Sequence, residues 1–186
     1  MEAMVVYDSF FGNTERIAQS IGSALGRPEN VGIVRVVDVS PEQLAGLKLL
    51  IVGSPTRAFR PSPAIKNFLK SIPKDSLNGV KVAAFDTRMM EEEINSAVFI
   101  LRIMVNIFGY AARPISDRLV KKGGQLIVPP EGFYVHGTKG PLKEGELERA
   151  ADWARQIITK QQPALKIVGW GSPHHDLIGG INPTLP

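Results

Sequence analysis

The chain has 186 residues, of which 44% are hydrophobic and 22% are charged, so it is long enough to bury one substantial core and fits a single domain. It contains no cysteine, which excludes disulfides and thiolate chemistry and suits a reducing compartment, so we expect a cytoplasmic protein. The formal net charge is +4, but the basic residues are scattered and form no stripe, so we expect no nucleic-acid partner.

Export and membrane insertion are not indicated by the sequence. Met1 to Met4 lead directly into an apolar run, without the basic and apolar regions of a signal peptide. The most apolar later stretch, 97–108, is interrupted by Arg102 and Asn106 and is too short to cross a bilayer. We therefore expect neither a membrane span nor a membrane partner.

Short apolar runs alternate with amphipathic patterns along the chain. Five runs are rich in aliphatic residues, as expected for strands buried on both faces, and they are Met4–Tyr7, Ile33–Val39, Leu47–Val52, Val80–Phe85 and Gln125–Val128. Helical spacing of apolar residues is found at 17–25, 94–108 and 147–158, and the segment 40–43 has the cap and proline of a short helix start. This alternation predicts an α/β fold, with a parallel five-stranded sheet covered by helices on both faces.

The predicted domain covers residues 1–162, and an irregular tail covers 163–186. The tail loses all periodicity and gathers glycine and proline. Its pair His174 and His175 has no further ligand at metal-binding spacing except Asp176, so we expect no metal site. Trp153 falls on the apolar face of the last helix and is predicted to lie in the core.

Three loops are expected to meet at the carboxyl ends of the strands, where open parallel sheets bind their ligands. They are Ser9–Thr14, Ser54–Pro61 and Asp86–Met90. The first combines hydroxyl groups and Gly12 directly before a helix, which predicts a phosphate site at the positive end of the helix dipole. The other interpretation is an ordinary turn in which Asn13 or Thr14 only caps the helix.

At this point the sequence resembles a known family. The motif SFFGNT is similar to the phosphate-binding loop of flavodoxin-like proteins, and VGSPTRAFRPSPAIKNFL and VAAFDTRM follow where that family has its other flavin loops. The segment from Gly123 to Ile157 resembles the closing strand, loop and helix of the family. The resemblance covers about residues 1–162, and it implies a three-layer flavodoxin-like fold with strand order 2-1-3-4-5 and FMN as the cofactor.

The resemblance also implies which residues contact FMN. It assigns the phosphate to the first loop, namely Ser9, Phe10, Phe11, Gly12, Asn13 and Thr14. It places the flavin ring between the second and third loops, at Ser54, Pro55, Thr56, Arg57, Phe59, Asp86, Thr87, Arg88 and Met89. Two departures from the family pattern are that Phe11 replaces a hydroxyl residue and that the third loop lacks the stacking tyrosine, which leaves Phe59 as the nearby aromatic residue.

Arginines in or beside the presumed flavin loops suggest a role for charge. Arg57, Arg60 and Arg88 are either solvated loop residues or a positive rim. A rim would stabilise the anionic reduced flavin and attract an acidic redox partner protein.

The leading hypothesis is an FMN-binding electron-transfer protein of the flavodoxin type, in which no side chain of the protein need be catalytic. Two alternatives remain open at this stage. One is an NAD(P)H-dependent quinone or flavin reductase on the same fold, and the other is a flavin-free regulatory or binding protein. No hydrolase or P-loop motif is present, and His136 is expected to be a bystander in a polar loop. The sequence does not indicate an oligomeric state.

Overall fold

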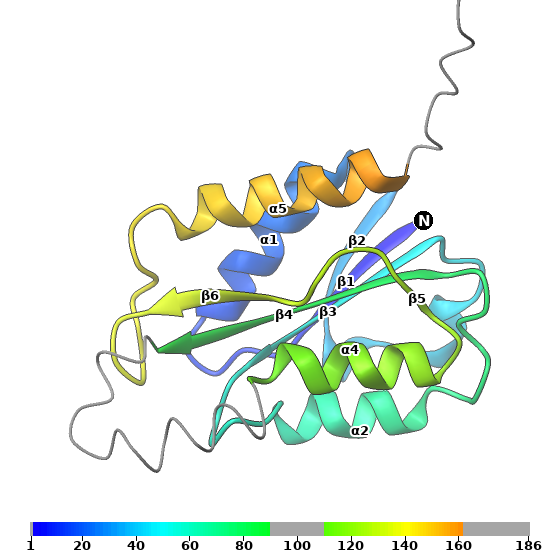
Figure 1. Ribbon diagram of the computed structural model, residues 1–186, viewed down its shortest axis with the longest axis horizontal. Helices are drawn as coiled ribbons and strands as arrows, with labels where there is room; N and C mark the ends of the chain where they lie inside the picture. Colours follow the sequence, from blue (N-terminus) through cyan, green and yellow to red (C-terminus); the bar gives the residue numbers. More distant parts are fainter. Residues whose placement is uncertain (1, 90–109, 162–186) are drawn as a thin grey trace, which may run out of the picture.

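The computed structural model describes residues 2–89 and 110–161, in which strands and helices alternate around one parallel sheet (Figure 1). The strands are β1 (Ala3–Tyr7), β2 (Val31–Arg35), β3 (Leu49–Pro55), β4 (Lys81–Met89), β5 (Gln125–Leu126) and β6 (Glu131–Val135). The helices are α1 (Asn13–Leu25), α2 (Pro63–Ser71), α4 (Ala112–Lys121) and α5 (Glu146–Gln161), with short 3-10 turns η1 (Val36–Asp38) and η2 (Pro41–Leu44).

The strand order is β2-β1-β3-β4-β5, with β6 also paired to β4, and every pairing is parallel. The predicted α/β fold and strand order are therefore confirmed. β1 is buried along its whole length, because helices cover both faces of the sheet.

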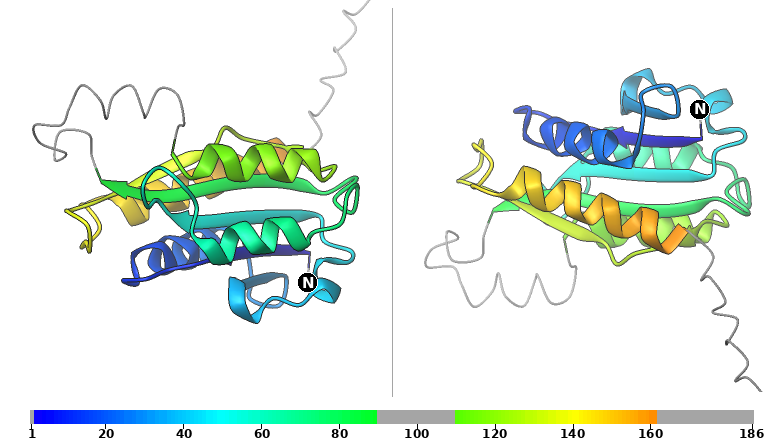
Figure 2. Two further views of the ribbon diagram at one scale, coloured as in Figure 1. Left: turned by 90° about the horizontal axis from the view of Figure 1, so that it is seen from below. Right: turned by 90° about the horizontal axis from the view of Figure 1, so that it is seen from above.

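Two helices cover each face of the sheet. α1 and α5 lie side by side on one face, and α2 and α4 on the other (Figure 2). A separate apolar core forms on each side. The α1/α5 core includes Phe85, Phe133 and Trp153, whose rings meet edge to face with centroids 6.0 to 6.3 Å apart. The prediction that Trp153 lies in the core is confirmed, since it is only 4% exposed.

The fifth strand differs from its predicted range, Gln125–Val128. Only Gln125 and Leu126 pair with the start of β4, and the second half of the strand is β6, which pairs with β4 from Phe85 onward. Pro129 and Pro130 fall in the interruption and cannot donate the backbone hydrogen bonds that a continuous ladder needs. The strand therefore reaches the ligand-binding edge of the sheet at Val135, which is seven residues later than predicted.

Other strand boundaries also shift. The predicted strand Ile33–Val39 ends at Arg35, where η1 begins, whereas β3 and β4 extend beyond their predicted ends to Pro55 and Met89. The prediction that the third loop begins at residue 86 was therefore wrong, because residues 86–89 belong to β4.

The short helix expected from 40–43 is the 3-10 turn η2, whose entry is capped by the Ser40 backbone N–H donating to Gln43 Oε1 at 2.8 Å. The helix expected at 94–108 and the tail 163–186 both lie wholly outside the described ranges. In the part of the chain that is described, no helix is both long and apolar enough to cross a membrane.

Candidate functional site

A cavity of about 240 Å³ opens at the carboxyl ends of β1, β3, β4 and β6. All three predicted loops contribute to it, as the rule for parallel sheets requires. The predicted residues that line it are Ser9, Phe10, Phe11, Asn13, Thr14, Pro55, Thr56, Arg57, Thr87, Arg88 and Met89. The expected convergence of segments far apart in the sequence is therefore observed.

One end of this cavity has the features of an anion site. Gly12 precedes α1 in the left-handed conformation, with a φ of 80°, and no side-chain hydrogen bond caps the helix. The Ser9 hydroxyl is buried there, and among the described residues it has no hydrogen-bond partner. Buried hydroxyl groups are normally paired, so an unpaired one beside an open helix N-terminus suits a phosphate group.

The interpretation of this turn as a simple helix cap is wrong for both residues considered. The Thr14 hydroxyl is hydrogen-bonded to the Thr87 hydroxyl at 2.8 Å, which ties the first loop to β4. Asn13 Nδ2 donates to the carbonyl of Lys139 at 2.9 Å, which ties the loop to the segment after β6. Both side chains therefore stabilise the shape of the loop and leave the first backbone N–H groups of α1 without side-chain acceptors.

An acidic residue lies next to this anion site. Asp8 is buried, and its carboxylate accepts a hydrogen bond from the Ser9 backbone N–H at 2.9 Å. Arg35 compensates this charge: one of its nitrogens lies 3.9 Å from the carboxylate and 2.8 Å from the Ser9 carbonyl, to which it donates. The local charge is thus balanced, and the anion site does not face an isolated carboxylate.

The other end of the cavity is apolar and is bounded by a tight hairpin. The backbones of Arg57 and Arg60 exchange hydrogen bonds of 3.1 and 3.0 Å, and the two residues between them, Ala58 and Phe59, both have positive φ. The Arg57 guanidinium lies 5.1 Å from the centre of the Phe10 ring, so the first and second loops meet across the cavity. Phe10, Pro55 and Met89 line the same cavity and offer apolar contacts to a ligand.

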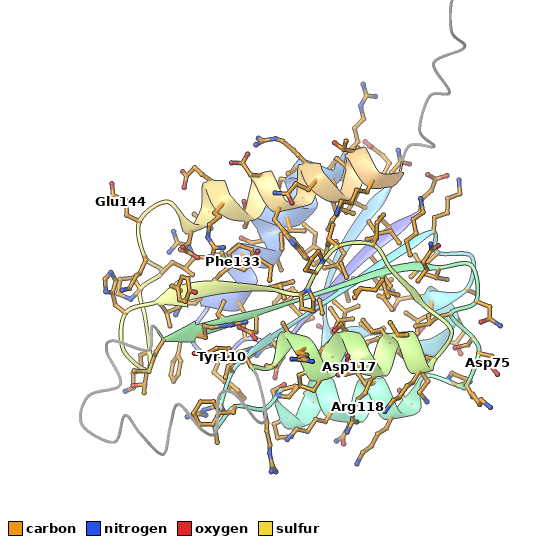
Figure 3. All side chains as sticks on the ribbon, viewed as in Figure 1. Asp75, Tyr110, Asp117, Arg118, Phe133 and Glu144 are labelled. Atoms are coloured by element: carbon orange, nitrogen blue, oxygen red, sulfur yellow. The ribbon has the colours of Figure 1, made fainter. Side chains whose placement is uncertain are left out.

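Arg88 is not a solvated loop arginine. It lies on β4, its side chain is 15% exposed, and it donates to both oxygens of the buried Asp86 at 2.6 and 2.8 Å. Its guanidinium also lies 3.8 Å from the centre of the Tyr110 ring, near the start of α4 (Figure 3). Its charge is thus paired, and a positive bias at the cavity comes from Arg57, which has no ion pair among the described residues.

Asp86 does not line the cavity, and its carboxylate instead forms hydrogen bonds within the fold. It accepts a hydrogen bond from the backbone N–H of Ala112 at 2.8 Å, so a strand carboxylate occupies the N-terminus of α4. Burial raises the pKa of Asp86, and the neighbouring Arg88 opposes that shift.

Three further predicted residues do not line the cavity directly. Gly12 shapes the first loop. Ser54 is fully buried, and its hydroxyl accepts the backbone N–H of Ser62 at 2.9 Å, which holds the start of α2. The Phe59 ring has its centroid 6.4 Å from that of Tyr110, and it lines a different cavity.

Four cavity residues were missed by the sequence analysis, namely Ala58, Val135, Gly137 and Thr138. Ala58 falls within the second predicted loop, but the resemblance assigned it no contact. The other three belong to the end of β6 and the segment after it. Ligands bind at the carboxyl ends of parallel strands. If the fifth strand had been predicted to end at Val135, the same rule would have indicated these three residues.

Fold and cavity together define an α/β protein with a cavity at the carboxyl edge of a parallel sheet. A family model described as a flavodoxin domain matches residues 4–108, more than half of the chain. The chain therefore belongs to the flavodoxin domain family. A comparison with curated proteins found no match.

Solved flavodoxin structures resemble the fold across most of the chain. A flavodoxin from the domain Archaea is 20% identical, covers 87% of this chain and 100% of its own, and has a TM-score of 0.63. Flavodoxin 2 from Bacillus cereus is 21% identical, with coverages of 86% and 99% and a TM-score of 0.66. A flavodoxin, WrbA-like protein from Agrobacterium tumefaciens is 18% identical, with coverages of 86% and 97% and a TM-score of 0.61. These likenesses concern the fold alone.

Proposed function

We propose that this protein binds FMN in the cavity and serves as an electron-transfer protein of the flavodoxin type. The observation that carries the proposal is the buried, unpaired Ser9 hydroxyl beside the uncapped N-terminus of α1. A buried donor without a partner costs free energy, on the order of 1 to 3 kcal/mol, and a phosphate oxygen at this place would satisfy it. Membership of the flavodoxin domain family supports the same ligand.

The residues of the cavity suit the two ends of FMN. Ser9, the loop around Gly12 and the first turn of α1 would hold the phosphate, because they offer a hydroxyl group, backbone N–H groups and the positive end of a helix dipole. Phe10, Pro55 and Met89 offer apolar contacts for the ring. When bound, FMN supplies the redox chemistry, while the protein binds it, orients it and sets its electrostatic surroundings.

Ligand titration tests this proposal. The flavin-free protein is titrated with FMN and with riboflavin, which lacks the phosphate, and flavin fluorescence reports binding. We expect FMN to bind at least about tenfold more tightly, because a charge-assisted hydrogen bond contributes about 1.5 to 3 kcal/mol. No FMN binding, or equal affinity for the two ligands, would contradict the proposal. NAD(P)H oxidation with a quinone acceptor then separates a reductase, which turns over, from a carrier, which does not.

A further inference from the structure

A second, basic cavity lies between α2 and α4 and shares the 57–60 hairpin with the cavity described above, which we call the flavin cavity because we propose that it binds FMN. Its volume is about 390 Å³, and we call it the basic groove. It is lined by Phe59, Arg60, Pro61, Lys66, Leu69, Lys70, Pro114 and Arg118. In Figure 3, Arg118 lies between α4 and α2. The groove thus combines four cationic side chains with an apolar lining, and no carboxylate of the described residues lines it.

The positive charge of the basic groove is not neutralised within the described ranges, 2–89 and 110–161. None of its four cations forms an ion pair there, although Arg35, Arg88 and Arg149 each do. Lys66 and Lys70 are four residues apart on α2 and therefore lie on one face of the helix, one turn apart. The groove is a strip of positive charge that points to an anionic ligand.

Two features favour a row of carboxylates over a single phosphate. Phosphate sites usually converge backbone N–H groups on one point, but at the start of α2 and of α4 a side chain already accepts a hydrogen bond from a backbone N–H group. The Ile65 backbone N–H donates to the Ser62 hydroxyl at 3.3 Å, and the Ala112 N–H donates to Asp86 at 2.8 Å. The groove therefore offers spaced positive side chains together with the apolar residues Phe59, Pro61 and Pro114. This combination suits an acidic peptide segment that also makes apolar contacts.

The 57–60 hairpin connects the basic groove to the flavin cavity. Arg57 and Ala58 line the flavin cavity, whereas Phe59 and Arg60 line the groove. Consecutive residues of one hairpin therefore line both cavities, so a protein seated in the groove would contact the same hairpin that borders the flavin cavity.

We propose that the basic groove is the docking site for an acidic segment of a redox-partner protein. This proposal rests on the proposed function, because it takes the flavin cavity as the site that the partner must reach. Docking in the groove orients the partner toward the hairpin, and attraction over the exposed cations speeds the encounter at low salt. Arg60, Lys66, Lys70 and Arg118 are the residues that recognise the partner.

The test measures binding of a fluorescently labelled oligoglutamate peptide to the full-length protein by anisotropy. The test variant is Lys66→Gln/Lys70→Gln. The matched control, Arg27→Gln/Lys160→Gln, removes the same charge from the α1/α5 side of the molecule. We expect the test variant to bind the peptide about tenfold more weakly and with a smaller salt dependence, because it loses two ion pairs with the peptide and each exposed ion pair contributes modestly. The control should bind within about twofold of the parent, because its two charges lie outside the groove.

Three outcomes would overturn the docking proposal. They are equal loss of peptide binding in the test and control variants, no binding by the parent at low salt, and equally tight, equally groove-dependent binding of single-stranded DNA of the same charge. The last would indicate a nucleic-acid surface. Peptide binding is measured with and without FMN. Failure to bind FMN contradicts the proposed function, whereas failure to bind the peptide contradicts the docking proposal, so the two results are distinguished. Circular dichroism confirms that both variants are folded.

Discussion

At Ser9, the stability of the fold and the binding of FMN make opposite demands on one hydroxyl group. It is buried and has no hydrogen-bond partner among the described residues, and we propose that it donates to phosphate when FMN is bound. Ser9→Ala removes an unsatisfied polar group, so the free energy of unfolding of the flavin-free protein should rise by about 1 kcal/mol. The same change should weaken FMN about tenfold and leave riboflavin unchanged.

Urea unfolding and flavin titration on the same samples measure the two effects of Ser9→Ala. Ser54→Ala is the comparison variant, because that hydroxyl is paired in the fold and its removal should lower stability. Loss of stability in Ser9→Ala together with unchanged FMN affinity would show that this hydroxyl belongs to the fold and not to the ligand site.

Asp86 gives the folded protein a dependence on pH. Burial raises the pKa of this carboxyl in the folded state, so the folded protein holds the proton more tightly than the unfolded chain does. Its stabilising contribution is present below the unfolded pKa, near 4, and is lost as pH rises through the raised folded pKa. Asp86→Asn removes the titrating group and keeps an oxygen to accept the Ala112 N–H.

The measurement is urea unfolding of wild-type protein and Asp86→Asn between about pH 4 and pH 8. The difference, wild type minus variant, should fall as pH rises. A difference that rises over this range would mean that attraction to Arg88 outweighs burial and that the pKa of Asp86 is lowered.

At the scale of elements, β6 is shaped to accept Arg88 from its neighbour β4. A Cβ atom on Gly132 would lie 2.2 Å from the Arg88 guanidinium carbon, so only glycine leaves room for that side chain. Gly132→Ala should therefore displace Arg88 from Asp86 and lower the free energy of unfolding by about 2 kcal/mol.

A double-mutant cycle isolates this contact between the strands. In an Arg88→Ala background the space is free, so adding Gly132→Ala should cost almost nothing. If the cost of Gly132→Ala is the same in both backgrounds, the glycine is needed for backbone reasons and not for Arg88.

At the scale of the whole molecule, the described residues that form the two cores all precede the tail. The α1/α5 core extends to Ile157 near the end of α5, and the α2/α4 core ends earlier in the chain, at Leu119. A chain truncated after Gln162 should therefore fold, melt within a few degrees of the full-length protein and keep its affinity for FMN, because it keeps every core residue that the structure describes. Thermal unfolding and flavin titration check this. Insolubility of the truncated chain would show that 163–186 is needed for the fold.

Much of the fold could be predicted because it depends on local patterns. Buried strands such as Leu49–Val52 are apolar throughout, and helices such as α5 repeat apolar residues at helical spacing. Strand ends were less predictable, since Asp86 and Thr87 are polar and read as loop, yet they continue β4 by pairing with β3 and β6. Pairing with a neighbouring strand is a tertiary interaction and leaves no local signal.

The sequence by itself determined the alternation of strands and helices, the position of the loop Ser9–Thr14 directly before the first helix and the resemblance to flavodoxins, because each depends on residues close together in the chain. Only the tertiary structure decided that Arg88 is paired with Asp86 while Arg57 faces the cavity, and that Arg60 joins Lys66, Lys70 and Arg118 in one groove. The sequence pattern does not indicate which side chain will pair with a given charged residue. The effect of each arginine therefore depends on which side chains the fold brings beside it.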